Sequence, residues 1–265
     1  GLLNSQPMGF YAPAQLVRDA RAHGVCVRPV DVTCSEWEST LEEVEPAAAG
    51  GAGPAADSGS GELSHSPPAH TLRPVRLGFN RLSGFREDAA QRIAVARAEA
   101  AFVSVEDLAR RAGLDAHALR LLADGNALSA LAGHRREAAW EVAGVDTRTA
   151  AAAVLRVTRT EEPERPALEA PSAGASLLAD YRRTGLSLAN HPLALLRPRL
   201  SEFRICTSAE LQGFRNGQLA RASGLVTHRQ RPQTAKGVVF VTLEDETGPV
   251  NVIVWPQVYE AQRTP

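Results

Sequence analysis

The chain has 265 residues, of which 44% are hydrophobic and 22% charged, a balance typical of a folded protein with one large or two small domains. No run approaches the roughly 20 apolar residues that a membrane-spanning helix needs, and the first four residues do not open a signal peptide. Three cysteines without a close pair exclude a disulfide framework and a Cys-x-x-Cys zinc site, which favours a reducing cytoplasm. The chain starts without a methionine and stops soon after a strand-like run, so we expect a piece of a longer protein.

The formal net charge of −1 conceals an asymmetry along the chain. Residues 29–72 hold eight acidic side chains and no lysine or arginine, which leaves a net charge of +7 for the rest. Within that remainder, residues 197–236 hold eight basic and two acidic side chains. The abundance of arginine can result from the codon usage of a GC-rich genome and is not by itself evidence of function. The clustering of the arginines along the chain is more informative. Basic segments in otherwise neutral chains often bind phosphate.

The first 72 residues predict a helix, a strand region and a flexible insertion. Pro13 marks the start of the helix and Gly24 its end, with apolar residues at helical spacing between them. Alternating valines over 25–32 predict a strand, which residues 35–44 continue. Residues 46–71 are mostly Ala, Gly, Pro and Ser, so we expect them to remain flexible.

Residues 73–145 predict a short strand followed by several short helices. Apolar residues alternate over 75–79, and helical spacing begins at Glu87. Ser104 and Asp115 each precede an apolar helical pattern, as N-caps do. We therefore expect a compact set of short, glycine-punctuated helices.

After a segment rich in Thr, Glu, Pro and Ala at 146–175, which we expect to be a linker, the pattern changes from helix to strand. Two helices are expected, at 177–183 and 192–197. Three β-rich runs then predict an antiparallel meander that does not close into a barrel, over 219–229, 237–244 and 249–255. The acidic run Glu244-Asp245-Glu246 between the last two strands favours a solvated turn.

The run Leu82-Ser83-Gly84-Phe85 lies just before the helix expected from Glu87. A glycine turn before a helix lets backbone N–H groups approach a phosphate, and the helix dipole favours the negative charge there. Such a turn with nearby arginines is typical of a helix-hairpin-helix element, which grips duplex DNA without reading its sequence. A plain helix N-cap is the alternative. The predicted duplex-binding residues are Arg81, Ser83, Gly84, Phe85, Arg86 and Arg92.

A second candidate surface lies in the β-rich segment. Its predicted hairpin carries several cations, and Phe240 and Trp255 offer faces on which bases could stack. Basic loops with aromatic strands are typical of an oligonucleotide-binding (OB) fold. The alternative is that both aromatic side chains belong to the core. The predicted strand-binding residues are Arg221, Arg229, Arg231, Lys236 and Phe240.

Catalytic motifs are absent from the sequence. It contains no P-loop, nucleophile elbow or zinc-protease motif, and its seven histidines lack metal-ligand spacing. Asp88, Asp107, Asp115 and Asp124 fit caps and turns better than metal ligation. We therefore predict no catalytic residue and no metal site in this chain.

Several motifs in a fixed order carry a family resemblance. The run from Gln6 to Val17, with His23-Gly24-Val25 and Arg28-Pro29-Val30-Asp31-Val32, is similar to the end of a polymerase fingers region. Further similar runs are Leu77-Gly78-Phe79 through Gly84, Ala96-Arg97, Phe102, Asp107-Leu108-Ala109, Thr184-Gly185-Leu186-Ser187-Leu188, His191-Pro192-Leu193, Gly224-Leu225-Val226, Arg229-Gln230-Arg231-Pro232, Thr234-Ala235-Lys236-Gly237 and Thr242 through Gly248. Together these motifs resemble the bacterial error-prone DNA polymerases, C-family relatives of the α subunit of DNA polymerase III.

The resemblance implies an α+β multidomain fold. It contains the end of a fingers region, a small helical helix-hairpin-helix domain and a truncated OB-fold β-barrel. The expected boundaries are 1–45 for the end of the fingers, 46–72 for the insertion, 73–145 for the helix-hairpin-helix domain, 146–175 for a linker, 176–216 for a helical connector and 217–265 for the partial OB-fold.

The resemblance also implies a function. We expect the C-terminal DNA-binding part of a cytoplasmic DNA-directed DNA polymerase that acts in translesion synthesis and damage-induced mutagenesis. The palm domain of the family, with its magnesium ions, would lie upstream, so this chain should hold no cofactor and be inactive alone.

The expected partners are duplex DNA and single-stranded template. Accessory mutagenesis proteins and the sliding clamp are further candidates, although residues 146–216 contain no convincing clamp-binding peptide. The alternatives are a stand-alone, non-catalytic nucleic-acid-binding module and a scaffold protein whose arginines reflect codon usage.

Overall fold

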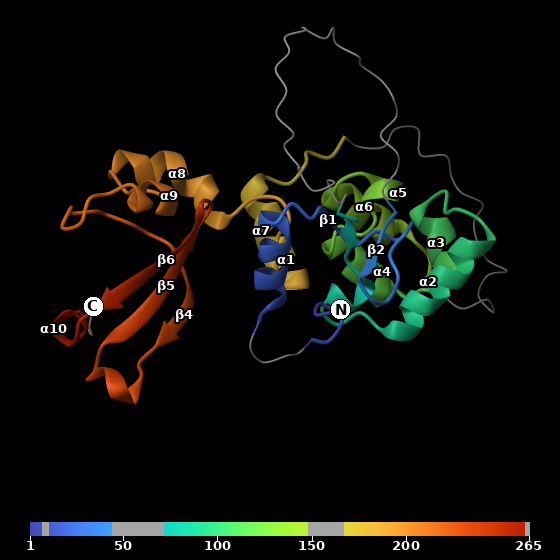
Figure 1. Cartoon of the computed structure of the whole chain (residues 1–265). Coiled ribbons are helices and arrows are strands. Elements are labelled where there is room, and N and C mark those ends of the chain that lie inside the picture. Colours follow the sequence, from blue (N-terminus) through green and yellow to red (C-terminus); the bar gives the residue numbers. More distant parts are fainter. Residues whose placement is uncertain (7–10, 44–71, 148–166, 263–265) are drawn as a thin grey trace, which may run out of the picture. The chain divides into compact units, whose positions relative to one another are not determined.

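The computed structural model describes residues 1–6, 11–43, 72–147 and 167–262. The chain divides into two compact units: unit 1 comprises Gly1–Pro171 with Ala179–Leu188, and unit 2 comprises Ser172–Leu178 with Ala189–Pro265. Both units contain helices and strands (Figure 1), so the α+β prediction is confirmed. No helix among the described residues is long and apolar enough to cross a membrane. Residues 46–71 of the predicted insertion (46–72) and residues 148–166 of the predicted linker (146–175) lie outside the described residues.

Unit 1 begins with helix α1 (Pro13–Ala22), whose first position is the predicted proline. A small sheet follows, built from β1 (Val27–Arg28), β2 (Thr40–Leu41) and β3 (Val75–Arg76). The central strand β3 pairs parallel with β1 and antiparallel with β2. The sheet therefore joins segments on either side of the predicted insertion.

The strand predictions in unit 1 were too long. The strand predicted over 25–32 is only β1, two residues long. Of the described residues 35–43, only β2 is a strand. The chain turns just before it, where the Thr33 N–H donates to Asp31 Oδ1 at 2.8 Å and the Asp31 N–H donates to Ser35 Oγ at 3.0 Å. The strand predicted over 75–79 ends at Arg76. A 3-10 helix, η1 (Phe79–Arg81), follows, and the carbonyls of Glu36 and Trp37 accept its first N–H groups. Local turn bonds therefore replace ladder bonds before β2 and after β3.

Five helices complete the described part of unit 1 before residue 148. They are α2 (Glu87–Glu99), α3 (Val105–Arg111), α4 (Ala116–Asp124), α5 (Ser129–Ala132) and α6 (Arg135–Gly144). The predicted caps are confirmed: Ser104 Oγ accepts the Asp107 N–H at 3.1 Å, and Asp115 Oδ1 accepts the Ala118 N–H at 2.7 Å. These bonds satisfy backbone donors that the first turn of a helix leaves free.

The core of unit 1 lies between η1 and the short helices. Its largest fully buried side chains include Phe79 of η1, Leu82 of the hairpin turn, and Ile93, Leu108, Leu119 and Leu122 of helices α2 to α4. Burying such side chains supplies about 1.5–3 kcal/mol each. The predicted DNA-binding turn is therefore anchored in the buried core of the unit.

The boundary between the units falls within α7 (Ala173–Thr184). Unit 2 continues with α8 (Pro192–Glu202), α9 (Ser208–Gln212), β4 (Leu225–Gln230), the 3-10 turn η3 (Gln233–Ala235), β5 (Val239–Asp245), β6 (Gly248–Val254) and α10 (Pro256–Ala261). The three strands form an antiparallel sheet in the order β4-β5-β6. Within the described residues this sheet does not close into a barrel.

The prediction of a solvated acidic turn at 244–246 is wrong, because this run is an internal junction of unit 2. The Asp245 side chain is 1% exposed and accepts hydrogen bonds from Ser208 N at 2.7 Å and Thr247 N at 2.8 Å. Arg197 of α8 pairs with both Asp245 and Glu246. Burial raises the pKa of Asp245, but hydrogen bonds from Thr247 and Ser208 outweigh it and hold the pKa below its usual range. The acidic run thus fastens α8 and α9 to the sheet.

Candidate nucleic-acid interface

The hairpin turn Leu82–Phe85 is anchored by its two ends and exposed at its middle. Leu82 and Phe85 are buried, and the Phe85 ring stacks on Phe79 with ring centres 5.5 Å apart. Ser83 and Gly84 are exposed between them. Gly84 has φ of +82°, a conformation that strains any residue with a Cβ. The turn therefore presents the Gly84 backbone at the surface, whereas the N–H groups of Ser83 and Phe85 are bonded within the chain.

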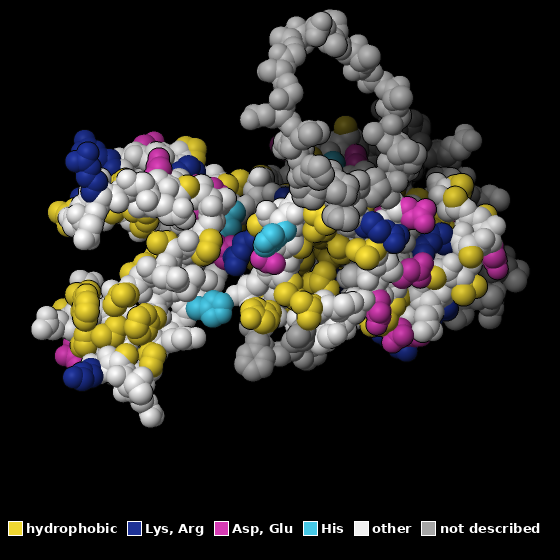
Figure 2. All heavy atoms as spheres, viewed as in Figure 1, with side chains coloured by type: hydrophobic (Ala, Val, Ile, Leu, Met, Phe, Trp, Pro, Cys, Tyr) yellow, Lys and Arg dark blue, Asp and Glu magenta, His cyan; other side chains and the backbone are white. Residues whose placement is uncertain are grey.

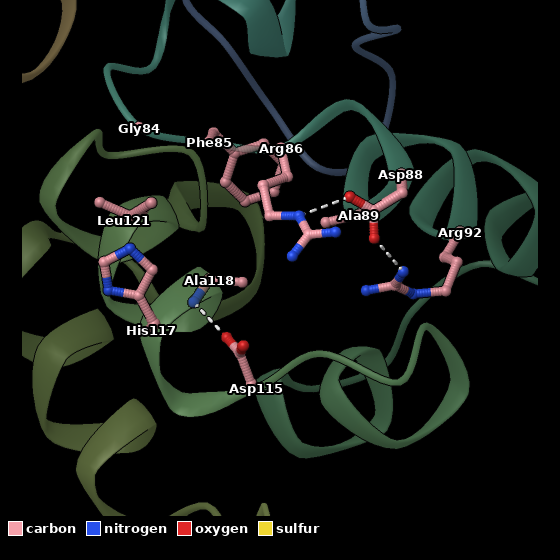
Figure 3. Close-up of a pocket in the computed structure, with 10 residues that line it drawn as sticks. All are labelled: Gly84, Phe85, Arg86, Asp88, Ala89, Arg92, Asp115, His117, Ala118 and Leu121. Carbon is pink, nitrogen blue, oxygen red and sulfur yellow. Dashed lines mark hydrogen bonds and ion pairs between the residues drawn. The ribbon is translucent and has the colours of Figure 1, made fainter.

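Two arginines and one carboxylate lie at the start of α2, directly after the turn. Asp88 accepts hydrogen bonds from Arg92 Nη1 at 2.7 Å and from Arg86 Nε at 2.8 Å, and Figure 3 shows both guanidinium groups directed toward it. The bond from Arg92, with the one from Arg86, holds the pKa of Asp88 below its usual range. The cluster keeps a net positive charge, and Arg86 is 79% exposed. It can therefore offer a cation beside the turn.

A small pocket lies between the hairpin turn with the start of α2 on one side and the start of α4 on the other. Asp115, His117, Ala118 and Leu121 line it opposite the turn and the first residues of α2 (Figure 3). The N-terminal ends of two helices thus adjoin one pocket, and helix N-termini favour anions. Sequence reasoning missed His117, although its place two residues after a predicted N-cap is the signal that puts it near the helix start.

The structure brings some predicted duplex-binding residues together and places others elsewhere. Gly84, Phe85, Arg86 and Arg92 all line the pocket. The buried Phe85 ring anchors the turn rather than facing outward. Arg81 is half-buried, and burial lowers the pKa of its guanidinium. The Ser83 N–H donates to the Arg183 carbonyl at 2.8 Å, so it is already occupied.

In unit 2, the predicted strand-binding residues gather around the β4–β5 hairpin. The guanidinium groups of Arg229 and Arg231 lie 5.6 and 5.4 Å from the centre of the Tyr259 ring, within cation–π range. Lys236 is exposed beside the hairpin tip. Arg221 lies apart, before β4, with a 3.5 Å contact to the carbonyl of Phe203. Sequence reasoning missed Tyr259 because it did not predict α10, although Pro256 signals a helix start.

The interpretation of Phe240 and Trp255 as core residues is wrong. Phe240 is 41% exposed and Trp255 61% exposed. Phe240 pairs across the sheet with Ile253, which is also exposed, and Figure 2 shows hydrophobic side chains gathered on this part of unit 2. Phe240 pairs with Gln230 and Arg229 pairs with Val241, so Phe240 and Arg229 lie on opposite faces of the sheet. The exposed rings of Phe240 and Trp255 are suited to stacking with nucleic-acid bases.

Among the described residues, no group of His, Cys, Asp or Glu side chains is arranged to hold a metal ion. The clusters at Asp88 and Asp245 are instead ion pairs with arginine. The hairpin turn of unit 1 is suited to binding anions. The β4–β5 hairpin of unit 2 is suited to binding anions and to stacking on planar rings.

Comparison with known proteins shows which motif family and which proteins the chain is similar to. Residues 24–138 match the helix-hairpin-helix motif family. The chain is 53% identical over 262 residues to an error-prone DNA polymerase from Ralstonia nicotianae, and 52% identical over 268 residues to one from an Azoarcus species. Both alignments cover 99% of this chain. This chain resembles error-prone DNA polymerases.

The resemblance inferred from the ordered motifs is thus confirmed. The chain spans only 22% of the length of the Ralstonia error-prone DNA polymerase and 23% of the Azoarcus one. An error-prone DNA polymerase from Bordetella parapertussis is 51% identical over 263 residues and is matched over 22% of its length.

Proposed function

We propose that this chain is the DNA-binding part of an error-prone DNA polymerase and contributes grip on DNA rather than chemistry. The observation that carries the proposal is the Gly84 turn, which exposes backbone at positive φ beside the Arg86–Asp88–Arg92 cluster and above a pocket that two helix N-termini adjoin. The match of this region to the helix-hairpin-helix motif supports it. Contacts of this kind hold the phosphate backbone and carry no sequence information.

In this proposal the two surfaces divide the work. Residues 73–145 hold duplex DNA through the hairpin, and residues 217–265, as part of an OB-fold, hold the single-stranded template through Arg229, Arg231, Lys236 and the exposed Phe240. The open aromatic faces of unit 2 and the stacking of both arginines on Tyr259 support the second half. Residues 1–45 would end the fingers region and 176–216 would connect the two DNA-binding parts.

The activity of the whole protein belongs to the same proposal. An error-prone polymerase would use magnesium at a palm site to extend primers across lesions in the cytoplasm, with accessory mutagenesis proteins and the sliding clamp as partners. The predicted DNA-binding residues would keep the template and the duplex product in place behind that site. The chain itself is expected to incorporate no nucleotide on primed template.

Fluorescence anisotropy of the 265-residue chain with labelled duplex and labelled single strand tests the proposal. Binding should be independent of base sequence and micromolar or weaker near physiological salt, as is usual for non-specific contacts. The logarithm of the binding constant should fall linearly with the logarithm of salt concentration, by about 0.9 per neutralised phosphate on duplex and about 0.7 on single strand. Absence of binding to either DNA at low salt would contradict the proposal.

A further inference from the structure

The exposed middle of the hairpin turn is held by one residue far along the chain. The Ser83 N–H donates a 2.8 Å hydrogen bond to the backbone oxygen of Arg183, and Arg183 Nη1 donates a 3.3 Å bond back to the Ser83 oxygen. Both polar backbone groups of Ser83 are therefore bonded to a residue of α7. Arg183 belongs to the part of α7 that is assigned to unit 1, so these contacts lie within one unit.

The same guanidinium reaches the far end of α4. Arg183 Nη2 donates to Asp124 Oδ2 at 2.7 Å. Next to it, a Cβ at Gly125 would lie 3.5 Å from Arg183 Cγ and 2.4 Å from Leu82 Cδ2, so the three segments pack closely here. Arg183 thus bridges the end of α4 and the exposed residue of the hairpin turn.

We infer that Arg183 is a positioning residue that fixes the hairpin turn in its DNA-gripping geometry without contacting DNA. The inference rests on the proposed function. Leu82 and Phe85 are held by burial, but Ser83 and Gly84 are exposed, and Gly84 has no side chain to restrain it. Arg183 supplies that restraint. Its side chain is only 24% exposed and its charge is paired with Asp124. The Arg183 guanidinium therefore bonds to the protein rather than to a phosphate.

The test compares Arg183→Ala with Arg182→Ala in the 265-residue chain. Arg182 is the adjacent, exposed arginine of α7, so its removal controls for the loss of one positive charge. Arg183→Ala should weaken duplex binding about three- to tenfold, because the turn loses a charge-assisted hydrogen bond. Arg182→Ala should change it by no more than about twofold, as expected for one exposed charge.

The salt dependence separates positioning from direct contact. An arginine that neutralises a phosphate contributes about 0.9 to the slope of binding against salt, whereas a positioning residue contributes close to none. The slope should therefore be the same for Arg183→Ala and the unaltered chain. Arg183→Lys keeps the charge but lacks the fork that reaches Ser83 and Asp124 together, so it should lose affinity as well.

Amide hydrogen exchange supplies a readout that does not depend on DNA. Arg183→Ala keeps the backbone bond from Ser83 N–H to residue 183 and removes the side-chain bond to the Ser83 oxygen. The turn should then open more often, so exchange should speed up at the hydrogen-bonded amides of Ser83 and Phe85 and stay unchanged at the core amides of Ile93 and Leu119. Equal acceleration in the core would mean a general loss of stability and would overturn the inference. So would unchanged duplex affinity, a slope reduced by about 0.9, or full binding by Arg183→Lys. Failure of the unaltered chain to bind duplex would instead overturn the proposed function, and this inference with it.

Discussion

Arg229 donates a 2.9 Å hydrogen bond from Nη2 to the hydroxyl of Tyr259, and its guanidinium also lies over the Tyr259 ring. Arg231 lies over the same ring, so a residue of α10 orders both cations of the β4 edge. These contacts connect α10, which follows β6, to the basic β4–β5 hairpin. They make Tyr259 the organising residue of the candidate strand-binding surface.

Replacing Tyr259 should therefore weaken single-strand binding. Tyr259→Ala removes the ring that holds both arginines, and we expect a loss of about threefold to tenfold, in line with cation–π energies of roughly 0.5–2 kcal/mol. Tyr259→Phe keeps the ring and loses only the hydroxyl bond, so it should retain most of the affinity. Anisotropy with labelled single strand measures both, and equal losses in the two variants would show that the ring is not what matters.

Removing the Asp88 carboxylate should strengthen duplex binding. Asp88 offsets one of the two positive charges of Arg86 and Arg92, so Asp88→Asn leaves both guanidinium groups without their carboxylate partner, although Arg92 Nε still donates to the Ala112 oxygen. We expect affinity to rise about threefold to tenfold and the salt slope to steepen by up to about 0.9. Glu87→Gln is the matched control, because it removes the same charge from the same helix turn but not from the arginine cluster. An equal gain in the control would point to net charge alone.

The buried Asp245 makes unit 2 sensitive to acid. Its pKa is depressed in the folded chain, so its contribution to stability is present above the ordinary aspartate pKa of about 3.9 and is lost as pH falls below it. Asp245→Asn puts an amide where Ser208 N and Arg197 donate, which should cost roughly 2–4 kcal/mol and lower the unfolding temperature. Thermal unfolding at pH 7 measures the effect. The exposed Glu260→Gln should unfold like the unaltered chain, and an equally stable Asp245→Asn would contradict the role of the carboxylate.

Gly78 is a point of close backbone approach in unit 1. A Cβ there would lie 2.3 Å from the backbone carbon of Glu38 and 2.4 Å from the Trp37 oxygen, contacts that neither partner can relieve by rotating a side chain. Gly78→Ala should therefore destabilise unit 1 by on the order of 3 kcal/mol or more. Gly144→Ala, with open space around it, should be neutral or stabilising by about 0.5–1 kcal/mol. Denaturant unfolding compares the two, and similar stabilities would refute the close approach.

Local sequence signals predicted the helices of unit 1 well. The caps at Ser104 and Asp115 and the proline at position 13 act within one turn of chain, so they can be read without knowing the fold. The strand lengths could not be predicted this way. Residues 36–37 bond to η1 rather than to a neighbouring strand, a choice set by segments more than 40 residues apart.

The candidate site was predictable in its backbone and less so in its side chains. The glycine turn before a helix is a local pattern, and the structure has Gly84 at the positive φ that the pattern requires. The contact of Arg183 with Ser83 joins residues 100 positions apart, and no spacing rule indicates it. The acidic run at 244–246 likewise looked solvated because its partner, Arg197, lies 49 positions before Glu246, in α8.

The division of DNA binding between two surfaces is the central claim, and one paired measurement tests it most directly. Arg86→Gln with Arg92→Gln should weaken duplex binding and flatten its salt slope by up to about 2, with little effect on single strand. Arg229→Gln, Arg231→Gln and Lys236→Gln together should do the reverse. If both sets of replacements reduce binding to both kinds of DNA equally, the two surfaces do not divide the work and a diffuse field of arginines explains the binding.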